Sequence, residues 1–226
     1  MRYLLHVHPS FTLLRVLAAA VVCLVVPLAA CAFRLGGADG ADGRDGTEAE
    51  AFGADGTGDW IVLFDGTSLD GWRGYLREDV PGGWTVQDEA LTFTPGVEGG
   101  DLMAPGLYED FELALEWRVG DCGNSGIFYH VEEREALRAT WQSGLEMQIL
   151  DDTCHGDAVY PSHTAGALYD LYVPTSAAAR PAGEWNTARI RVEDGTITHR
   201  LNGETIVRAE RGTEAWQARV AASKFR

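Results

Sequence analysis

The 226-residue chain has room for one domain and additional segments, and its formal net charge is −16 at pH 7. Residues 1–31 hold two basic and no acidic side chains, so the rest carries 16 basic against 34 acidic, a net charge of −18. This balance excludes a nucleic-acid-binding protein, which needs basic grooves, and suits a soluble domain or one that binds cations.

Residues 1–31 are predicted to be an export signal. "MRYLLHVHPSFTLLR" carries Arg2 and Arg15, and the uncharged "VLAAAVVCLVVPLAA" follows it. This apolar run is shorter than the roughly 20 residues that span a membrane. The "LAAC" that ends at Cys31 resembles the lipobox of bacterial lipoproteins, in which the signal is cut before a cysteine that becomes lipidated. We therefore expect an exported chain, lipid-anchored at Cys31 to a bacterial membrane, periplasmic or on the cell surface. A signal cut after "PLAA", without lipid, is the alternative.

Residues 32–58 are predicted to be a linker. Their "GGADGADGRDGTEAEAFGADGTG" is rich in Gly and Asp and has almost no apolar content, which is typical of a flexible tether. The repeated Asp-Gly units suggest a calcium loop, but the closing glutamate of an EF-hand is missing. The folded domain is expected to occupy residues 59–226.

Two cysteines, Cys122 and Cys154, remain in the domain. In an oxidising compartment they can pair, and closing such a loop would contribute about 3–4 kcal/mol to stability. Two free thiols are the equal alternative, because the sequence does not show whether the geometry permits a bond.

Alternation of apolar and polar residues dominates the domain and predicts strands. Helix signals are weak: residues 132–141 are either a short helix or a loop, and residues 213–222 favour a helix. Asp-Gly at 194–195 and Asn-Gly at 202–203 supply the positive φ angles of tight hairpin turns. The predicted strands are residues 60–64, 84–93, 111–119, 125–131, 144–152 and 165–173, followed by three short strands within 188–210.

Many short strands with Gly-rich turns, and no alternation of strands with helices, predict two packed antiparallel sheets. We therefore expect an all-β antiparallel sandwich of the jelly-roll type, with the apolar faces of its sheets in the core.

The run "GLEMQILDD" from Gly144 to Asp152 raises a question of function. Glu146 and Gln148 point away from the apolar face of the strand, and Asp151 lies at its end. A solvated outer face is the ordinary fate of such residues, and a turn is the ordinary role of an aspartate at a strand end. If neighbouring strands bring Asn124, His130 or Tyr169 close, the same polar face becomes a site.

No compact catalytic motif is present, since the chain has neither HExxH nor GxSxG. Titratable candidates near neutrality are His130, His155 and His163. Any metal site would have to be assembled from separate strands, so a divalent metal is left open. The aromatic residues near these segments either stack on sugar rings or belong to the core; they are Trp72, Tyr129, Trp141, Tyr160 and Tyr169.

Seven segments in chain order resemble the 3-keto-disaccharide hydrolase domain family. They are "WIVLFDGTSLDGWRG", "YEDFELALEWRV", "GNSGIFYHV", "GLEMQILDD", "TAGALYDLY", "PAGEWNTARIRVEDGTITHRLNG" and "SKF". The resemblance implies a jelly roll similar to concanavalin-like lectins and glucanases, bacterial export, and action on 3-keto sugars. Two departures are His130, where many members have arginine, and an end at "SKFR", which lacks the family's last strand.

The resemblance also implies a chemistry, because a ketone at C3 acidifies the proton on C2. Removal of that proton expels the group on C1, and addition of water then completes hydrolysis. Glu146 or His130 is the expected base, and His163, Tyr169 or Asp151 is the expected proton donor or ligand. Sugar contacts are expected from Asn124, Gln148, Trp141, Tyr169 and His163. A non-catalytic carbohydrate-binding module is the alternative, and a surface interaction domain without a sugar ligand is a third possibility.

Overall fold

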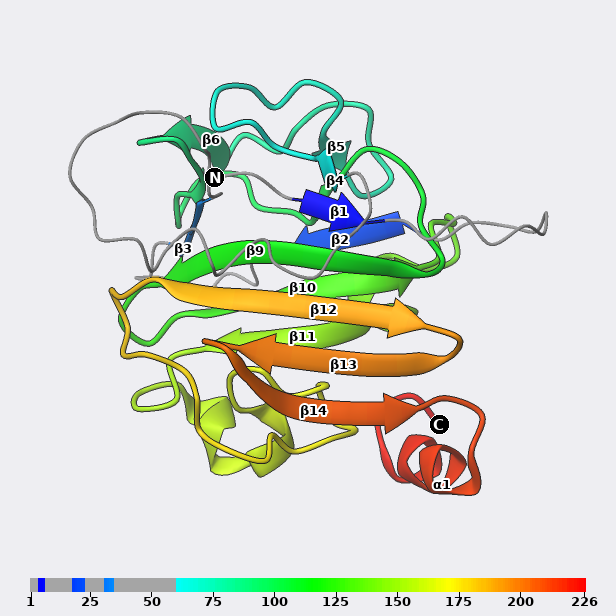
Figure 1. Ribbon diagram of the computed structural model, residues 1–226. Coiled ribbons are helices and arrows are strands. Elements are labelled where there is room, and N and C mark those ends of the chain that lie inside the picture. The colour runs from blue at the N-terminus through cyan, green and yellow to red at the C-terminus, as the bar shows by residue number, and fades with distance from the viewer. Residues whose placement is uncertain (1–3, 7–17, 23–30, 35–59) are drawn as a thin grey trace.

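The computed structural model describes residues 4–6, 18–22, 31–34 and 60–226, and they form two antiparallel sheets that pack on each other (Figure 1). The larger sheet runs in the order β14 (Glu204–Glu210), β13 (Thr196–Leu201), β12 (Asn186–Glu193), β9 (Phe111–Val119), β3 (Cys31–Arg34), β7 (Ala90–Phe93) and β6 (Trp84–Gln87). Off this path, β1 (Leu4–His6) pairs with β9, and β4 (Trp60–Val62) pairs with β1. The smaller sheet runs β11 (Leu145–Leu150), β10 (Asn124–Val131), β2 (Ala18–Val22), β8 (Leu102–Met103) and β5 (Arg73–Gly74). The expected β-sandwich is confirmed.

The meander β12–β13–β14 shows how local sequence sets the larger sheet. Its two turns carry positive φ at both central residues, 47° and 76° at Asp194-Gly195 and 49° and 87° at Asn202-Gly203. These are the angles that two-residue hairpins require, and Asp-Gly and Asn-Gly adopt them readily. The turns therefore fix the register of the three strands, as the sequence predicts.

The core lies between the two sheets and comes from the apolar face of each strand. Trp117 of β9 and Ile127 and Tyr129 of β10 are fully buried in it. Each such side chain contributes about 1.5–3 kcal/mol through burial. The Tyr129 hydroxyl and His199 Nε2 lie 3.0 Å apart, and His199 Nδ1 donates to the Gly166 carbonyl, so these buried polar groups are satisfied.

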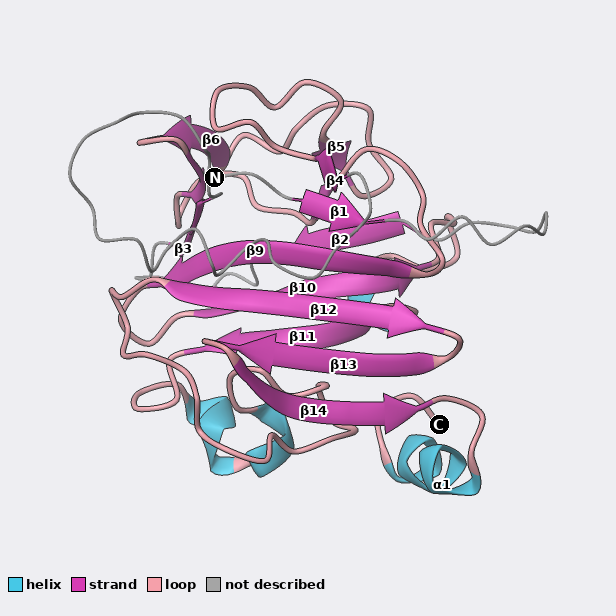
Figure 2. Cartoon of the chain, viewed as in Figure 1, coloured by secondary structure: helices cyan, strands magenta, loops and turns pink. Residues whose placement is uncertain are grey.

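The helical content is small, and most of it lies at one end of the sandwich (Figure 2). Helix α1 (Glu214–Ala222) is capped by the Thr213 hydroxyl, which accepts from the Trp216 amide, and this confirms the predicted helix. Residues 132–141 are mostly loop, and their only helical turn is the 3₁₀ segment η2 (Thr140–Gln142). No helix in the described ranges is long and apolar enough to cross a membrane.

The strand predicted at residues 165–173 is wrong. Gly166 and Asp170 have φ of 84° and 62°, and these left-handed residues turn the chain where a strand would continue. The segment instead packs beside β11 through backbone hydrogen bonds. The Gln148 amide donates to the Ala167 carbonyl, and the Tyr169 amide donates to the Glu146 carbonyl.

Three strands come from ranges that the sequence predicts as signal and linker. β1 pairs with β4 and β9, β2 pairs with β10 and β8, and β3, which begins at Cys31, pairs with β7 and β9. The remainder of the predicted signal (1–31) and linker (32–58) lies outside the described residues.

Candidate functional site

Glu146 lies in β11, at the edge of the smaller sheet, with its carboxyl group against the neighbouring strand β10. In β11, all six residues are buried, and Glu146 pairs with Phe128 of β10 while Gln148 pairs with Gly126. A methyl group on Gly126 would overlap Glu146 Oε1. The strand therefore needs glycine at this position, because the carboxyl group occupies the space that a side chain would take.

The chain brings Lys224 to this carboxyl from beyond α1. Lys224 Nζ lies 3.8 Å from Glu146 Oε2. Burial raises the pKa of Glu146 to about 8, the charges of Asp101 and Asp157 act in the same direction, and Lys224 opposes them. Burial also lowers the pKa of Lys224. Both partners of the pair are thus desolvated, and this moves the pKa of each toward neutral pH.

Aromatic rings surround this pair. Lys224 Nζ lies 4.1 Å from the ring centroid of Tyr169 and 6.0 Å from that of Trp141. The ring of His163 stacks on Tyr169 with centroids 4.2 Å apart, and Tyr160 packs on His163 at 5.1 Å. Trp141 and Tyr160 are also half-exposed, so apolar surface is available to a ligand beside the buried charges.

Asp170 ties two of these groups together. Its Oδ2 accepts from the Lys224 backbone amide at 2.7 Å, and its Oδ1 lies 3.4 Å from His163 Nε2. The other ring nitrogen of His163, Nδ1, is buried and has no hydrogen-bond partner in the described part of the chain. The left-handed backbone of Asp170 therefore serves an arrangement that fixes both His163 and Lys224 beside Tyr169.

Asn124 and Gln148 lie on the same pair of strands, at the edge of this group. Asn124 Nδ2 donates to Asp157 Oδ2 over 3.5 Å, and Asp157 belongs to the 3₁₀ segment η3 (Gly156–Val159). Gln148 is buried, and its Oε1 accepts from the Ile149 amide. Of the predicted sugar contacts, Trp141, Tyr169 and His163 surround the Glu146–Lys224 pair, and Asn124 reaches it through Asp157.

His130 is not brought to Glu146. The register of β10 shifts between Phe128 and Val131, and His130 has a φ of 54°, so its ring turns toward the core side. His130 Nε2 donates to the Glu109 carbonyl, and Arg211 donates to His130 Nδ1. Burial, with the charge of Arg211, lowers the pKa of His130. The prediction that His130 lies beside Glu146 is therefore wrong, because it assumed a regular strand in which side chains alternate between the two faces.

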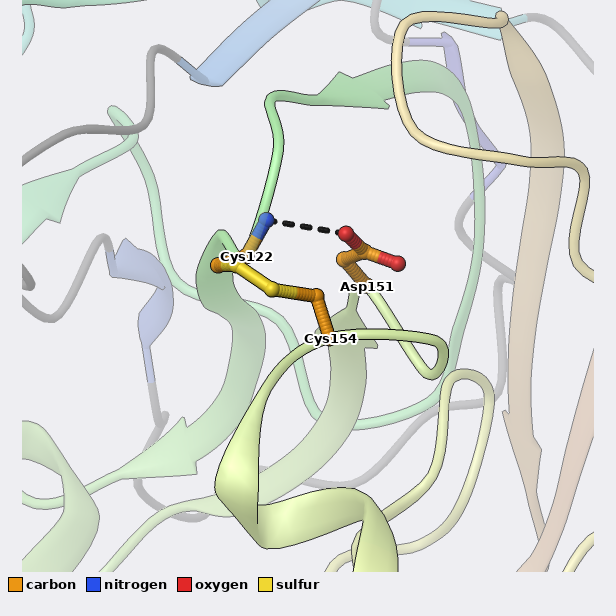
Figure 3. A group of neighbouring side chains, drawn as sticks. All are labelled: Cys122, Asp151 and Cys154. Carbon is orange, nitrogen blue, oxygen red and sulfur yellow. Dashed lines mark hydrogen bonds between the residues drawn. A yellow bond between two sulfur atoms is a disulfide. The ribbon is translucent and has the colours of Figure 1, made fainter.

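Asp151 is also held elsewhere, at the far end of β11 (Figure 3). Its carboxylate accepts hydrogen bonds from the Cys122 amide and from the amide and hydroxyl of Thr153. Cys122 and Cys154 form a disulfide next to it. Burial opposes the ionisation of Asp151, but these donors, with the Thr153 hydroxyl first, hold its pKa below the ordinary value.

The group formed by Cys122, Asp151 and Cys154, here called the disulfide corner, is relevant to whether the chain binds a metal ion. Within the described ranges, Cys122, Asp151 and Cys154 are the only three His, Cys, Asp or Glu residues whose ligand atoms lie close enough together to share an ion. The two sulfur atoms are bonded to each other, so in this oxidised form they are not available as thiolate ligands.

Sequence reasoning missed Lys224, Asp101 and Asp157. Asp101 lies in a loop and Asp157 in the short 3₁₀ segment η3, neither with a periodic pattern, and only the fold places them near Glu146. Lys224 did carry a signal, because it is the only lysine in the whole chain and every other basic residue is arginine.

Known proteins resemble this chain in sequence. Residues 59–225 match the sequence profile of the 3-keto-alpha-glucoside-1,2-lyase-like domain. A 3-keto-disaccharide hydrolase from Bacteroides thetaiotaomicron is 36% identical over 190 residues, which cover 76% of this chain and 64% of that protein. The chain therefore spans less than two thirds of that relative's length.

Solved structures share the fold. A candidate glycosyl hydrolase from Parabacteroides distasonis ATCC 8503 superposes with a TM-score of 0.67 and 30% identity, over 73% of this chain and 78% of that one. A second candidate glycosyl hydrolase from the same organism gives a TM-score of 0.52 and 24% identity, over 62% and 72% of the two chains. The fold of this chain is thus shared with both solved structures.

Proposed function

Because this chain belongs to the 3-keto-alpha-glucoside-1,2-lyase-like domain family, we propose that its Glu146–Lys224 site cleaves the glycosidic bond of 3-keto-glucosides or 3-keto-disaccharides. The proposal combines two independent supports. The family and the B. thetaiotaomicron relative point to substrates with a ketone at C3, and the geometry supplies a base and a cation at one place.

Glu146 is the proposed base. A general base works best when its pKa is near the working pH, and burial raises the pKa of Glu146 to about 8. The group can therefore take a proton at one step and return it at another. Lys224 lies 3.8 Å from it, and a cation at this distance would stabilise the negative charge that develops as the C2 proton leaves.

The proposed reaction has three steps. Glu146 removes the proton on C2, and the ketone at C3 accepts the electron pair. The C1–O bond then breaks, and protonated Glu146 gives its proton to the departing oxygen. Water adds to C1 of the resulting enone and a proton returns to C2, so the net reaction is hydrolysis.

Sugar binding is assigned to the surroundings of this pair. Trp141 and Tyr160 are 45% and 57% exposed, which leaves ring faces free to contact the apolar faces of a disaccharide. Asn124 offers an amide to sugar hydroxyls at the same edge. These aromatic surfaces would also serve a carbohydrate-binding module without catalysis, which is the second candidate function.

The observation that carries the proposal is the buried Glu146–Lys224 pair among aromatic rings. The test is the release of p-nitrophenol from a p-nitrophenyl 3-keto-glucoside, by wild type and by Glu146→Gln, with and without a chelator. We expect release by the wild type only. If both proteins bound the 3-keto-glucoside saturably and equally but released no p-nitrophenol, the chain would be a carbohydrate-binding module and not an enzyme. A loss of release with chelator, restored by a divalent metal, would add a metal to the site.

We also propose that the chain is exported and anchored through lipid on Cys31. The Cys122–Cys154 disulfide suits an oxidising compartment. Cleavage before Cys31 would remove β1 and β2 and keep β3. Intact mass of the membrane-extracted protein tests this, because Cys31→Ser should abolish both the lipid and the membrane association. An unprocessed N-terminus on the wild type would refute it.

A further inference from the structure

Lys224 stands out among the basic residues of the chain. It is the only lysine in 226 residues, so every other cationic position is filled by arginine. Guanidinium groups keep their proton under all ordinary conditions, whereas an ammonium can lose one when it is desolvated. A single lysine in an arginine-only background suggests a role that arginine is unable to fill, which is that of a neutral amine.

The Lys224 amine is desolvated among aromatic rings, and this burial, not the rings themselves, favours its neutral form. Tyr169, Phe225 and Trp141 place their ring centroids 4.1, 5.0 and 6.0 Å from Nζ. The ion-pair contact of Nζ in the described ranges is with Glu146, at 3.8 Å. By comparison, Arg189 and Glu112 approach to 2.8 Å in the larger sheet. The Lys224 contact is thus longer than a close salt bridge, and burial lowers the pKa of the amine.

The backbone of Lys224 is fixed with respect to Glu146. Its amide donates to Asp170 Oδ2, and the preceding Ser223 is buried. The residue before Asp170, Tyr169, donates its own amide to the Glu146 carbonyl. Two backbone-anchored contacts therefore hold the amine and the carboxyl at one place, which is the arrangement that a two-group reaction needs.

We propose that Lys224 acts as a nucleophile that forms a Schiff base with the C3 ketone of the substrate. This inference rests on the proposed function and names the way in which the ketone is activated. A neutral amine adds to a ketone carbon to give a carbinolamine, and loss of water then leaves a C=N bond. Neither step needs a reagent beyond the amine, the ketone and a proton donor.

Glu146 balances the protons of this sequence. In its protonated form it gives a proton to the departing C3 oxygen, which leaves as water, so that an iminium cation and a Glu146 carboxylate remain. The carboxylate then takes the proton from C2, and the iminium accepts the electron pair to become a neutral enamine. The enamine expels the C1 oxygen, which takes the proton back from Glu146. Addition of water to C1 and hydrolysis of the C=N bond restore the amine and release a 3-keto sugar.

The geometry fits this order of events. C2 is bonded to C3, so a substrate joined to Lys224 Nζ brings its C2 proton toward the Glu146 carboxyl, 3.8 Å from that nitrogen. Reacting atoms need to approach to roughly 3–3.5 Å. The cation formed at the nitrogen also stays over the face of Tyr169, where an aromatic ring attracts positive charge.

The test is reductive trapping on the full chain. Wild type, Lys224→Arg and Glu146→Gln are each incubated with a 3-keto-glucoside and sodium cyanoborohydride, then digested and mapped by mass spectrometry. Because Lys224 is the only lysine, an adduct on any other amine can come only from the chain's N-terminus, and the peptide map separates the two. We expect an adduct on Lys224 in the wild type and a smaller one in Glu146→Gln, which lacks the proton donor for the loss of water. We expect none in Lys224→Arg and none with an ordinary glucoside.

Kinetics give the second arm of the test. Lys224→Arg keeps a cation beside Glu146 but is unable to form the C=N bond, so turnover should fall by at least about 10³-fold with an unchanged circular dichroism spectrum. Turnover by the wild type without an adduct, together with a Lys224→Arg variant active within tenfold, overturns the Schiff base and leaves the proposed function standing. Neither adduct nor turnover in the wild type overturns both.

Discussion

Glu146 near the start of strand β11 and Asp151 just after its end are held in opposite ways. Glu146 is buried against Gly126 and raised in pKa to about 8. Asp151, which follows the strand, is also buried, yet three hydrogen-bond donors from Cys122 and Thr153 lower its pKa. Five residues at about 3.3–3.4 Å each place them roughly 17 Å apart.

The difference teaches how to tell a structural carboxylate from a reactive one. Donors that converge on a carboxylate stabilise its charge and leave it little tendency to take a proton. A desolvated carboxyl beside a single distant cation keeps that tendency. We therefore assign Asp151 to the disulfide corner and Glu146 to the reaction, although the two look alike in the sequence.

The most direct test of these two assignments is to replace each acid in turn by its neutral amide. Glu146→Gln should lower kcat/KM for a 3-keto-glucoside by about 10³-fold, within the usual range for loss of a general base. Asp151→Asn should keep kcat/KM within about threefold and lower the free energy of unfolding by about 1–3 kcal/mol, because buried donors lose a charged acceptor. Steady-state kinetics and urea unfolding of both variants decide it, and a reversed pattern would exchange the two roles.

The disulfide should matter to stability alone. Replacing Cys122 and Cys154 together by serine should lower the free energy of unfolding by about 3–4 kcal/mol, as expected for a cross-link with a sequence separation of 32. Turnover at a temperature where the variant stays folded should be unchanged. A collapse of turnover in the folded variant would show that the corner also sets the position of Asp157, and the two ends of β11 would no longer be independent.

The pH dependence of stability should separate the acids in sign. Glu146 has a folded pKa of about 8 against an ordinary 4.5, so its contribution is complete below pH 4.5 and is lost as the pH rises through 8. Glu146→Gln lacks this loss, and its stability relative to the wild type should rise by about 4 kcal/mol between pH 5 and 9. Asp151 has a lowered pKa, so its contribution is lost at acidic pH instead. Thermal unfolding across pH measures both, and parallel curves for Glu146→Gln and wild type would contradict a raised pKa.

The smallest expected effect on turnover comes from a substitution in β10, the strand that contacts the Glu146 carboxyl group. Gly126→Ala should displace Glu146 and lower kcat/KM by about tenfold, since the added methyl group overlaps Oε1. Gly156→Ala is the matched control, because a methyl group there meets open space and the residue needs no left-handed backbone. Equal kinetics for the two variants would mean that Glu146 has room to move aside.

Much of the fold follows from the sequence because strands and turns are local signals. Alternation locates β9 and β11, and the Asp-Gly and Asn-Gly turns locate the meander. The segment at 165–173 escapes the same reasoning, since its alternation is overruled by left-handed backbone at Gly166 and Asp170. Hydrophobic pattern reports which residues become buried, and it does not report where the chain turns within the buried segment.

The candidate site is less predictable, because it depends on neighbours that are distant in sequence. Glu146 and Tyr169 emerge from strand parity and from family resemblance, and the structure does bring them together. His130 does not join them, since a bulge turns its ring away. Lys224 reaches Glu146 only because the segment after α1 packs beside β11. No periodic pattern in the sequence predicts such a contact.

The contacts of Asp170 with the Lys224 amide and with His163 have a consequence for the order in which the protein folds and becomes active. The meander β12–β14 closes through two-residue turns, so it can form early from neighbouring residues. Gly126, Glu146, Asp170 and Lys224 meet only when distant segments dock, and closing long loops is the slow part of folding. During refolding from urea, β-sheet signals should therefore recover ahead of turnover, and turnover reports the last contacts to form.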